Sequence, residues 1–237
     1  MHALAAIAYL IGVVLLGLTF FPFSPMTLKL WMPSRKTMLF AHRNRYLLRG
    51  LGVSGLVVCF LLGVSGLVTS GWTWVAVLTA AFFAFFWWGA YVPVVMGYPQ
   101  AQKLLSAQEA EAVLKPEDDV LGVVVDGEAR AYSRTAITRP HLYYDTLGST
   151  PLTVTYCILC NSGIVFKSEL DGRPLHLQPI TAFNNNIIYY DSQSGNYVQQ
   201  MEGKVIAGPQ AGAQLAAVPA MLTTWQAWKA LYPHTTV

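Results

Sequence analysis

Two long apolar segments without charged residues constrain the fold of this chain most. Ala3 to Phe23 is 21 residues without a charge, and Gly50 to Gln102 contains no Asp, Glu, Lys or Arg. About 20 helical residues, at about 1.5 Å each, cross the roughly 30 Å hydrocarbon core of a bilayer. The first segment predicts one transmembrane helix and the second predicts two, with a turn at Ser70-Gly71. The expected helices cover residues 3–23, 50–70 and 73–97 of an anchor that extends over residues 1–98.

The distribution of charge predicts how this anchor is oriented. The chain is 54% hydrophobic and only 11% charged, whereas about a quarter of the residues in soluble domains are charged. Six basic residues and no acidic residue lie in 1–102, and all twelve acidic residues lie between Glu109 and Glu202. The basic residues gather in the loop 24–49, which the positive-inside rule places in the cytoplasm. We therefore expect an integral inner or plasma membrane protein with its amino terminus outside and the following domain in the cytoplasm.

The distribution of charge also indicates which partners to expect. The net charge of +3 averages two unlike halves, so it gives no reason to expect nucleic acid. The lipid bilayer is the expected partner, and other membrane subunits are a further one. A cleaved signal peptide is the rival interpretation of the first segment, but its basic residues follow the apolar run instead of preceding it.

Beyond residue 98 the pattern changes to short strands separated by turns. Residues 99–116 predict an amphipathic linker helix, and 117–237 predict a β-rich domain. Asp126-Gly127 is a strong two-residue hairpin signal. The fold class we expect is membrane-anchored α+β, with three transmembrane helices followed by a mainly antiparallel β domain, either a sandwich or a barrel, and a C-terminal helix. The expected strands are 120–125, 129–133, 151–156, 163–168, 175–179, 186–190, 197–201 and 204–207, and the expected helix is 223–232.

Cys157 and Cys160 are the pair of residues that most clearly indicates a functional site. Two thiols at this spacing can share a metal, form a disulfide or act as a redox pair. The thioredoxin arrangement requires a helix after the first cysteine, whereas Gly163 and an apolar strand follow here. A metal-binding turn fits the local sequence better. Cys59 lies in an apolar segment, where we expect it to be packed or to face lipid.

A metal centre would need further ligands. His141 is the first candidate, and Cys157, Cys160 and His141 together resemble a zinc site with an open position or a soft copper site. The same three residues are the candidate catalytic groups. Arg130, which lies within an otherwise apolar strand, and Asp145 are expected to support the site, where Arg130 could bind a carboxylate. Asn186 could cap a turn or donate to a ligand.

An ordered series of motifs in the second half of the chain resembles an uncharacterised prokaryotic family, the domain of unknown function 3179. The resemblance extends over about residues 117–237 and implies the domain but no activity. Many similar proteins are exported, which implies an extracytoplasmic domain as the alternative location, where the two cysteines could form a disulfide. The matching residues are Gly127-Glu-Ala-Arg-Ala-Tyr132, His141, Asp145, Gly148, Val154-Thr-Tyr-Cys-Ile-Leu-Cys-Asn161, Asn186, Tyr190-Asp191, Gly208, Gly212, Thr224-Trp225, Trp228 and Pro233.

The chain departs from the family pattern at three positions near these motifs. Ile158 stands where the family usually has Pro, Asn161 where it has Gly, and Leu142 where it commonly has Glu. The last difference removes an acid that could have acted beside His141. Both thiols and His141 match the pattern.

Three functions follow from these observations. The first is a membrane-anchored domain whose Cys-x-x-Cys motif binds a metal or cycles as a thiol redox pair. The second is a non-catalytic binding or assembly module of a membrane complex, in which the cysteines only pack. The third is a hydrolase or transferase that uses a thiolate nucleophile with His141 as base.

Overall fold

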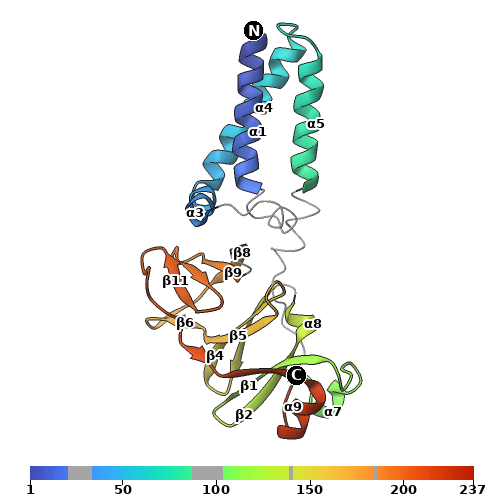
Figure 1. Ribbon diagram of the computed structural model, residues 1–237, viewed down its shortest axis with the longest axis vertical. Coiled ribbons are helices and arrows are strands. Elements are labelled where there is room, and N and C mark those ends of the chain that lie inside the picture. The colour runs from blue at the N-terminus through green and yellow to red at the C-terminus, as the bar shows by residue number, and fades with distance from the viewer. Residues whose placement is uncertain (21–33, 87–103, 139–140, 184–185) are drawn as a thin grey trace. The chain divides into compact units, whose positions relative to one another are not determined.

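The computed structural model describes residues 1–20, 34–86, 104–138, 141–183 and 186–237. The chain separates into two compact units, Met1–Pro93 and Val94–Val237. The first contains only helices in its described part, and the second contains antiparallel sheets with short helices (Figure 1). The chain is therefore a mixed helix and antiparallel-sheet protein with a C-terminal helix.

The first unit has four described helices: α1 (His2–Phe20), α3 (Arg35–Arg43), α4 (Arg45–Val64) and α5 (Gly71–Phe86). Of the described helices, α1 and α4 are long and apolar enough to cross a membrane. Helix α5 is described over 16 residues, fewer than the roughly 20 that a crossing needs. The described residues thus contain two such helices instead of the expected three, and the rest of the third predicted span, 87–97, lies outside them.

Glycines allow α1 and α4 to pack with their backbones in close contact. A Cβ atom on Gly55 would lie 2.6 Å from the Ala8 carbonyl oxygen, and one on Gly12 would lie 2.9 Å from the Gly52 carbonyl oxygen. Such distances are shorter than van der Waals contact, so a larger residue would push the helices apart. This agrees with the general use of small residues between membrane helices.

A short connection precedes the sheets of the second unit. Its described part contains one helical turn, α7 (Ala107–Ala110), which begins with a capping box between Ser106 and Glu109. The linker helix expected over 99–116 is therefore shorter than predicted within the described residues. After α7 the backbone forms tighter turns, with the Val113 N–H bonded to the Ala110 carbonyl, and Pro116 follows, which has no N–H to continue a helix.

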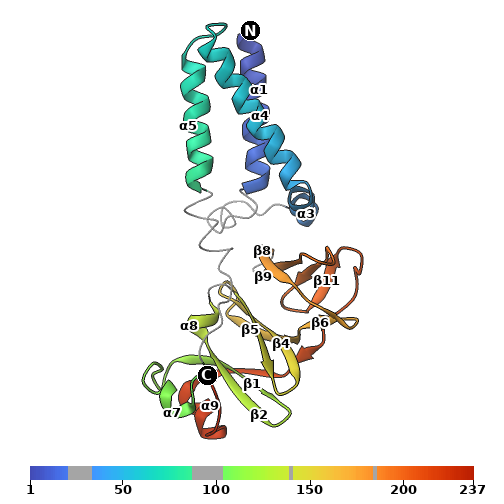
Figure 2. The ribbon, with the colours of Figure 1, turned by 180° about the vertical axis from the view of Figure 1, so that it is seen from behind.

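The second unit is built from three principal antiparallel sheets and a small hairpin (Figures 1 and 2). Sheet order is β13-β1-β2 in the first sheet, β12-β5-β4-β3 in the second and β11-β10-β9-β8 in the third, and β6-β7 is the hairpin. The strands are β1 (Asp119–Val125), β2 (Glu128–Ser133), β3 (Leu142–Leu147), β4 (Thr150–Cys157), β5 (Ser162–Lys167), β6 (Glu169–Leu170), β7 (Arg173–Pro174), β8 (Leu177–Phe183), β9 (Asn186–Asp191), β10 (Tyr197–Gln199), β11 (Lys204–Ala207), β12 (Ala217–Val218) and β13 (Ala220–Thr224).

The second sheet lies between the other two, and β4 is covered on both faces. Alternate residues of β4, Leu152, Val154 and Tyr156, pack in a core with β1 and β2. Cys157, on the opposite face, packs with β8, β9 and β10 in another core. Every residue of β4 from Leu152 to Cys157 is buried, so the first cysteine lies at the end of a continuously buried stretch of this strand.

The outer face of the first sheet is covered by helix α9 (Trp225–Leu231). Thr224 caps α9, because its hydroxyl accepts a hydrogen bond from the Ala227 N–H at 3.3 Å. Trp228 lies directly over Gly122 in β1, where an added Cβ would be 2.2 Å from two atoms of the indole ring. Glycine at position 122 is therefore required by the tryptophan above it.

The Asp126-Gly127 hairpin is confirmed, since it joins β1 and β2. The sequence also predicts a hairpin in which Asp171-Gly172 leads into the strand 175–179; in the structure this turn joins the two-residue strands β6 and β7, and the predicted strand begins later, as β8. The three-layer arrangement of sheets is more extended than a two-sheet sandwich, because two sheets use both of their faces for packing.

Candidate functional site

The two thiols lie at the end of the β4–β5 hairpin. Cys157 is the last residue of β4 and pairs with Ser162, the first of β5. Cys160 lies in the connecting turn, whose final residue, Asn161, has a φ of +49°. The Tyr156 hydroxyl donates a hydrogen bond of 2.5 Å to the Asn161 side-chain oxygen. Because Asn tolerates the left-handed conformation better than most residues, this turn brings the Cys160 sulfur back over Ser162.

Polar groups from three elements surround the Cys160 sulfur. Ser162 Oγ lies 2.9 Å from Cys160 Sγ. The Asn186 amide nitrogen at the start of β9 donates to the same sulfur over 3.8 Å. The Cys157 thiol also hydrogen-bonds to Cys160. Donors at a sulfur favour its thiolate form, so the site is arranged to stabilise negative charge on Cys160.

The two cysteines titrate in opposite directions. Burial raises the pKa of the Cys157 thiol, and its hydrogen bond to Cys160 raises it further. For Cys160, burial also acts to raise the pKa, but donation from Ser162, Cys157 and Asn186 outweighs this, and the pKa falls below its ordinary value. The result is a pair with one thiolate-prone sulfur that is partly accessible and one protonated sulfur behind it.

A buried glutamine holds the donors in place. Gln200 is fully buried, and its amide nitrogen donates to the Thr155 hydroxyl at 3.2 Å and to the Ser162 carbonyl at 3.1 Å. Its oxygen accepts a hydrogen bond of 3.1 Å from Asn186. Gln200 thus connects β4, β5 and β9 behind Cys160, which fixes the orientation of the Asn186 amide.

The surface beside Cys160 is apolar. Ile158 is 58% exposed and Leu159 is 49% exposed, and both lie in the turn between the two cysteines. Met201, whose N–H donates to the Asn186 side-chain oxygen, is 47% exposed. Exposed apolar side chains that lie together are typical of a surface that contacts a partner.

His141 has a different environment from the one expected. Its Nδ1 atom lies 3.3 Å from the Tyr156 carbonyl oxygen, and its own carbonyl accepts a hydrogen bond of 2.9 Å from the Tyr189 hydroxyl. Within the described ranges, no group of three His, Cys, Asp or Glu side chains is placed to hold a metal ion. The structure brings Cys157 and Cys160 together but does not add His141 to them as a third ligand.

This donor set is too small for zinc, which needs at least three protein ligands, because the residues with defined placement supply two sulfurs. The zinc or copper expected from the sequence stays a prediction.

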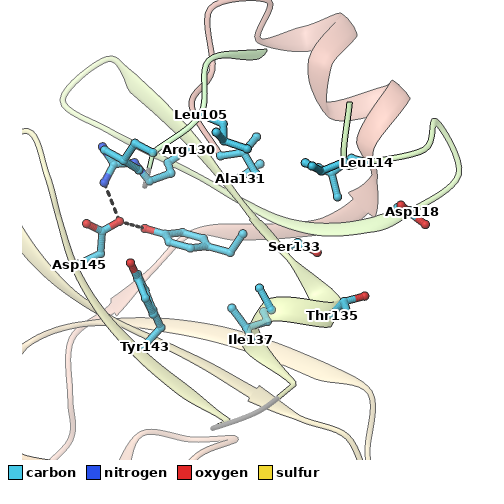
Figure 3. Close-up of a pocket in the computed structure, with 15 residues that line it drawn as sticks. Leu105, Leu114, Asp118, Arg130, Ala131, Ser133, Thr135, Ile137, Tyr143 and Asp145 are labelled. Carbon is cyan, nitrogen blue, oxygen red and sulfur yellow. Dashed lines mark hydrogen bonds and ion pairs between the residues drawn. The ribbon is translucent and has the colours of Figure 1, made fainter. Parts of the chain in front are cut away.

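Arg130 and Asp145 lie in a second cluster, separate from the Cys160 donors. Arg130 Nη1 donates to Asp145 Oδ2 at 2.6 Å, and the Tyr132 hydroxyl donates to the same oxygen at 2.8 Å (Figure 3). Arg130 also donates to the Thr146 carbonyl and the Thr236 hydroxyl. Figure 3 shows that this cluster lines a cavity, whose volume is about 400 Å³.

The two clusters differ in what they can do. Asn186 is the predicted support residue that contacts the cysteine turn, whereas Arg130 and Asp145 bind each other at the cavity.

A family model described as "Protein of unknown function (DUF3179)" matches residues 97–237. The chain belongs to the DUF3179 family. The match confirms the family resemblance. It places both clusters within the DUF3179 domain.

The comparisons give the DUF3179 domain no function by analogy. No curated protein matches the chain, and no solved structure matches it. The geometry of the two clusters is therefore what bears on function. Sequence reasoning did not identify Gln200 or Ser162, because their role depends on strand pairings that no local motif reveals.

Proposed function

We propose that the DUF3179 domain of this chain is a membrane-anchored thiol–disulfide exchange module. The observation that carries the proposal is the arrangement at Cys160, where Ser162, Asn186 and Cys157 all form hydrogen bonds with one partly exposed sulfur. A depressed thiol pKa with an adjacent resolving thiol is typical of redox cysteines.

The reaction assigned to this pair is reduction of a disulfide in a partner. The Cys160 thiolate attacks one sulfur of the partner disulfide, forms a mixed disulfide and releases the other partner sulfur as a thiolate. Cys157 then loses its proton and attacks the Cys160 sulfur, which releases the second partner thiolate. The module ends with a Cys157–Cys160 disulfide: it has given up two electrons to the partner sulfurs and the one proton of Cys157, and the two partner thiolates take up that proton and a second one from water.

The exposed turn supports the choice of a protein partner. Ile158 and Leu159 lie between the two cysteines and expose apolar surface. An extended apolar peptide segment that carries a disulfide could cover these side chains as it approaches Cys160. The same surface would serve a non-catalytic assembly module, so cysteine reactivity decides between the two functions.

The anchoring part of the proposal has its support in the first unit. Helices α1 and α4 are long and apolar enough to cross a bilayer, and apolar side chains such as Leu10 and Leu61 are exposed on them. With the basic loop 24–49 in the cytoplasm, two crossings would leave the DUF3179 domain outside. We propose that α5 begins a third crossing, which returns the chain to the cytoplasm, where thiols are kept reduced.

Selective alkylation over a range of pH tests the redox proposal. Because its pKa is lowered, Cys160 keeps its thiolate at lower pH than a free thiol does. We expect iodoacetamide to label Cys160 with a midpoint below that of a free cysteine measured alongside it, and to label Cys157 only at higher pH. Mass spectrometry of peptides from the full chain in detergent micelles measures both rates.

Two variants serve as a matched pair in this experiment. Ser162→Ala removes a donor to the Cys160 sulfur and is expected to move the labelling midpoint upward. Ser192→Ala removes an exposed hydroxyl that bonds to the His176 carbonyl and is expected to leave the midpoint unchanged. Faster labelling of Cys157 than of Cys160, or the same midpoint for Cys160 and a free thiol, would contradict the proposed roles.

A topology experiment tests the anchoring. The full chain is expected to stay in the membrane fraction after extraction at alkaline pH, because its apolar helices lie in the bilayer. A membrane-impermeant maleimide should then label Cys160 in inverted vesicles and not in intact spheroplasts. Labelling only from the outside would show an even number of crossings and refute the cytoplasmic placement, and release by alkaline extraction would refute the anchor.

A further inference from the structure

The cavity beside the Arg130–Asp145 ion pair has the size and lining of a small-molecule site. Its volume is about 400 Å³, within the range of roughly 300–1,000 Å³ that is usual for ligand pockets. Leu105, Leu114 and Ile137 contribute to its apolar wall. Figure 3 shows Arg130, Asp145 and Tyr143 grouped on one side of the cavity and Leu114 and Thr135 on the other.

In the described residues, the polar side of the cavity has hydrogen-bond donors without a partner. Arg130, which is only 7% exposed, uses Nε for Thr236 and Nη1 for Asp145 and Thr146. In the described part of the chain, its Nη2 group has no hydrogen-bond partner. The Tyr143 hydroxyl, which also has none there, points toward Asp145 (Figure 3).

The acceptors on this side are already occupied. Asp145 Oδ2 accepts from Arg130 and Tyr132, and Oδ1 accepts from the Thr146 N–H at 2.7 Å. A ligand therefore gains most from an oxygen that accepts hydrogen bonds, and little from a donor. Neither donor is among the side-chain atoms that are buried without a partner, so both are open to the cavity, where an oxygen of a ligand could accept hydrogen bonds from them.

Charge decides what kind of acceptor fits. The cavity is lined by one guanidinium, Arg130, and two carboxylates, Asp145 and Asp118. Because Asp145 already neutralises Arg130, an anionic ligand would meet excess negative charge. We propose that this cavity binds a neutral, mainly apolar molecule whose carbonyl oxygen accepts hydrogen bonds from Tyr143 and from Arg130 Nη2. This site is independent of the thiol chemistry proposed above.

A matched pair of ligands tests the proposal on the unaltered protein. The probes are 4-fluoroacetophenone and 4-fluoro-α-methylstyrene, which differ only in a carbonyl oxygen replaced by a CH₂ group. Fluorine NMR titration of the full chain in micelles, with empty micelles as reference, measures binding of each. We expect the ketone to bind at least about fivefold more tightly, the value of one hydrogen bond near 1 kcal/mol. Equal affinities, or no binding beyond that of empty micelles, would overturn the proposal.

Variants of residues that line the cavity test whether the two probes bind there. Tyr143→Phe retains the ring and removes the hydroxyl, so it should weaken the ketone about fivefold and leave the hydrocarbon unchanged. Tyr190→Phe, in another sheet, is the control and should change neither. Ala136→Trp, at an exposed position on the cavity wall, should abolish binding of both probes. Full affinity in Ala136→Trp would refute the site.

An anionic analogue tests the charge argument. We expect 4-fluorobenzoate to bind more weakly than the ketone, because two carboxylates line the cavity against one guanidinium. Tighter binding of the benzoate would overturn the assignment to neutral carbonyl compounds. A melting curve for each variant shows whether it is folded, and the ligand pair on the unaltered chain remains decisive if a variant is not.

Discussion

Gly122→Ala is expected to destabilise the DUF3179 domain by about 3 kcal/mol, the upper part of the usual range for overpacking a core. The added methyl group would lie 2.2 Å from two ring atoms of Trp228 and 2.5 Å from a third. Trp228 cannot move aside easily, because its indole N–H donates to the Thr235 hydroxyl at 3.0 Å and its ring packs against Tyr232. Scanning calorimetry of the full chain in micelles measures the change.

A double-mutant cycle separates this clash from a general effect of alanine on β1. Trp228→Phe makes the ring that the methyl group would meet smaller, so Gly122→Ala should lower the free energy of unfolding much less in that background. Gly50→Ala is a second control, since an added Cβ there meets no atom within 4 Å. If Gly122→Ala lowers the free energy of unfolding by the same amount with tryptophan and with phenylalanine at position 228, the packing explanation is wrong.

Cys160→Ser is expected to lower disulfide reduction by the full chain by more than about 100-fold, because it removes the attacking sulfur. Cys157→Ser should have a different effect. It leaves the attack by Cys160 in place but removes the resolving thiol, so a mixed disulfide with the partner should accumulate. Reduction of a fluorescent peptide disulfide measures the rate, and non-reducing gels with mass spectrometry detect the trapped species.

The control for these cysteine variants is Cys59→Ser. Cys59 lies in α4, outside the thiol pair, and its sulfur bonds to the Trp72 carbonyl. Its replacement should leave the rate of disulfide reduction unchanged. Full activity in Cys160→Ser, or no mixed disulfide in Cys157→Ser, would contradict the order of attack and leave assembly of a complex as the better function.

Local patterns predicted most of the strands in the second unit. The Asp126-Gly127 turn identified the first hairpin, and alternation identified β4. Strand β3 was not predicted, because Asp145 interrupts its apolar pattern, and the carboxylate is accommodated there by Arg130 and Tyr132 of β2, which both bond to it. Strand β13 was also missed, since its pairing partner β1 lies about a hundred residues earlier.

The candidate site was predictable only in part. The spacing of Cys157 and Cys160 identified the thiol pair, and Asn186 was among the proposed supports. The donor network behind Cys160 was not predictable, because Gln200 reaches Thr155 across 45 residues of sequence. His141 was the first candidate for a third ligand among the available side chains, but strand pairing directs its ring nitrogen to the Tyr156 carbonyl.

The enclosure of β4 on both faces has a consequence for dynamics. A strand with neighbours on both edges and cores above and below opens only when much of the domain opens, so its amide hydrogens should exchange among the slowest in the molecule. Cys157 sits at the end of this rigid strand, while Cys160 sits in a surface turn. In the proposed thiol exchange, one sulfur of the pair would move while the other keeps its position, so the motion that accompanies oxidation would be confined to a few residues of the turn.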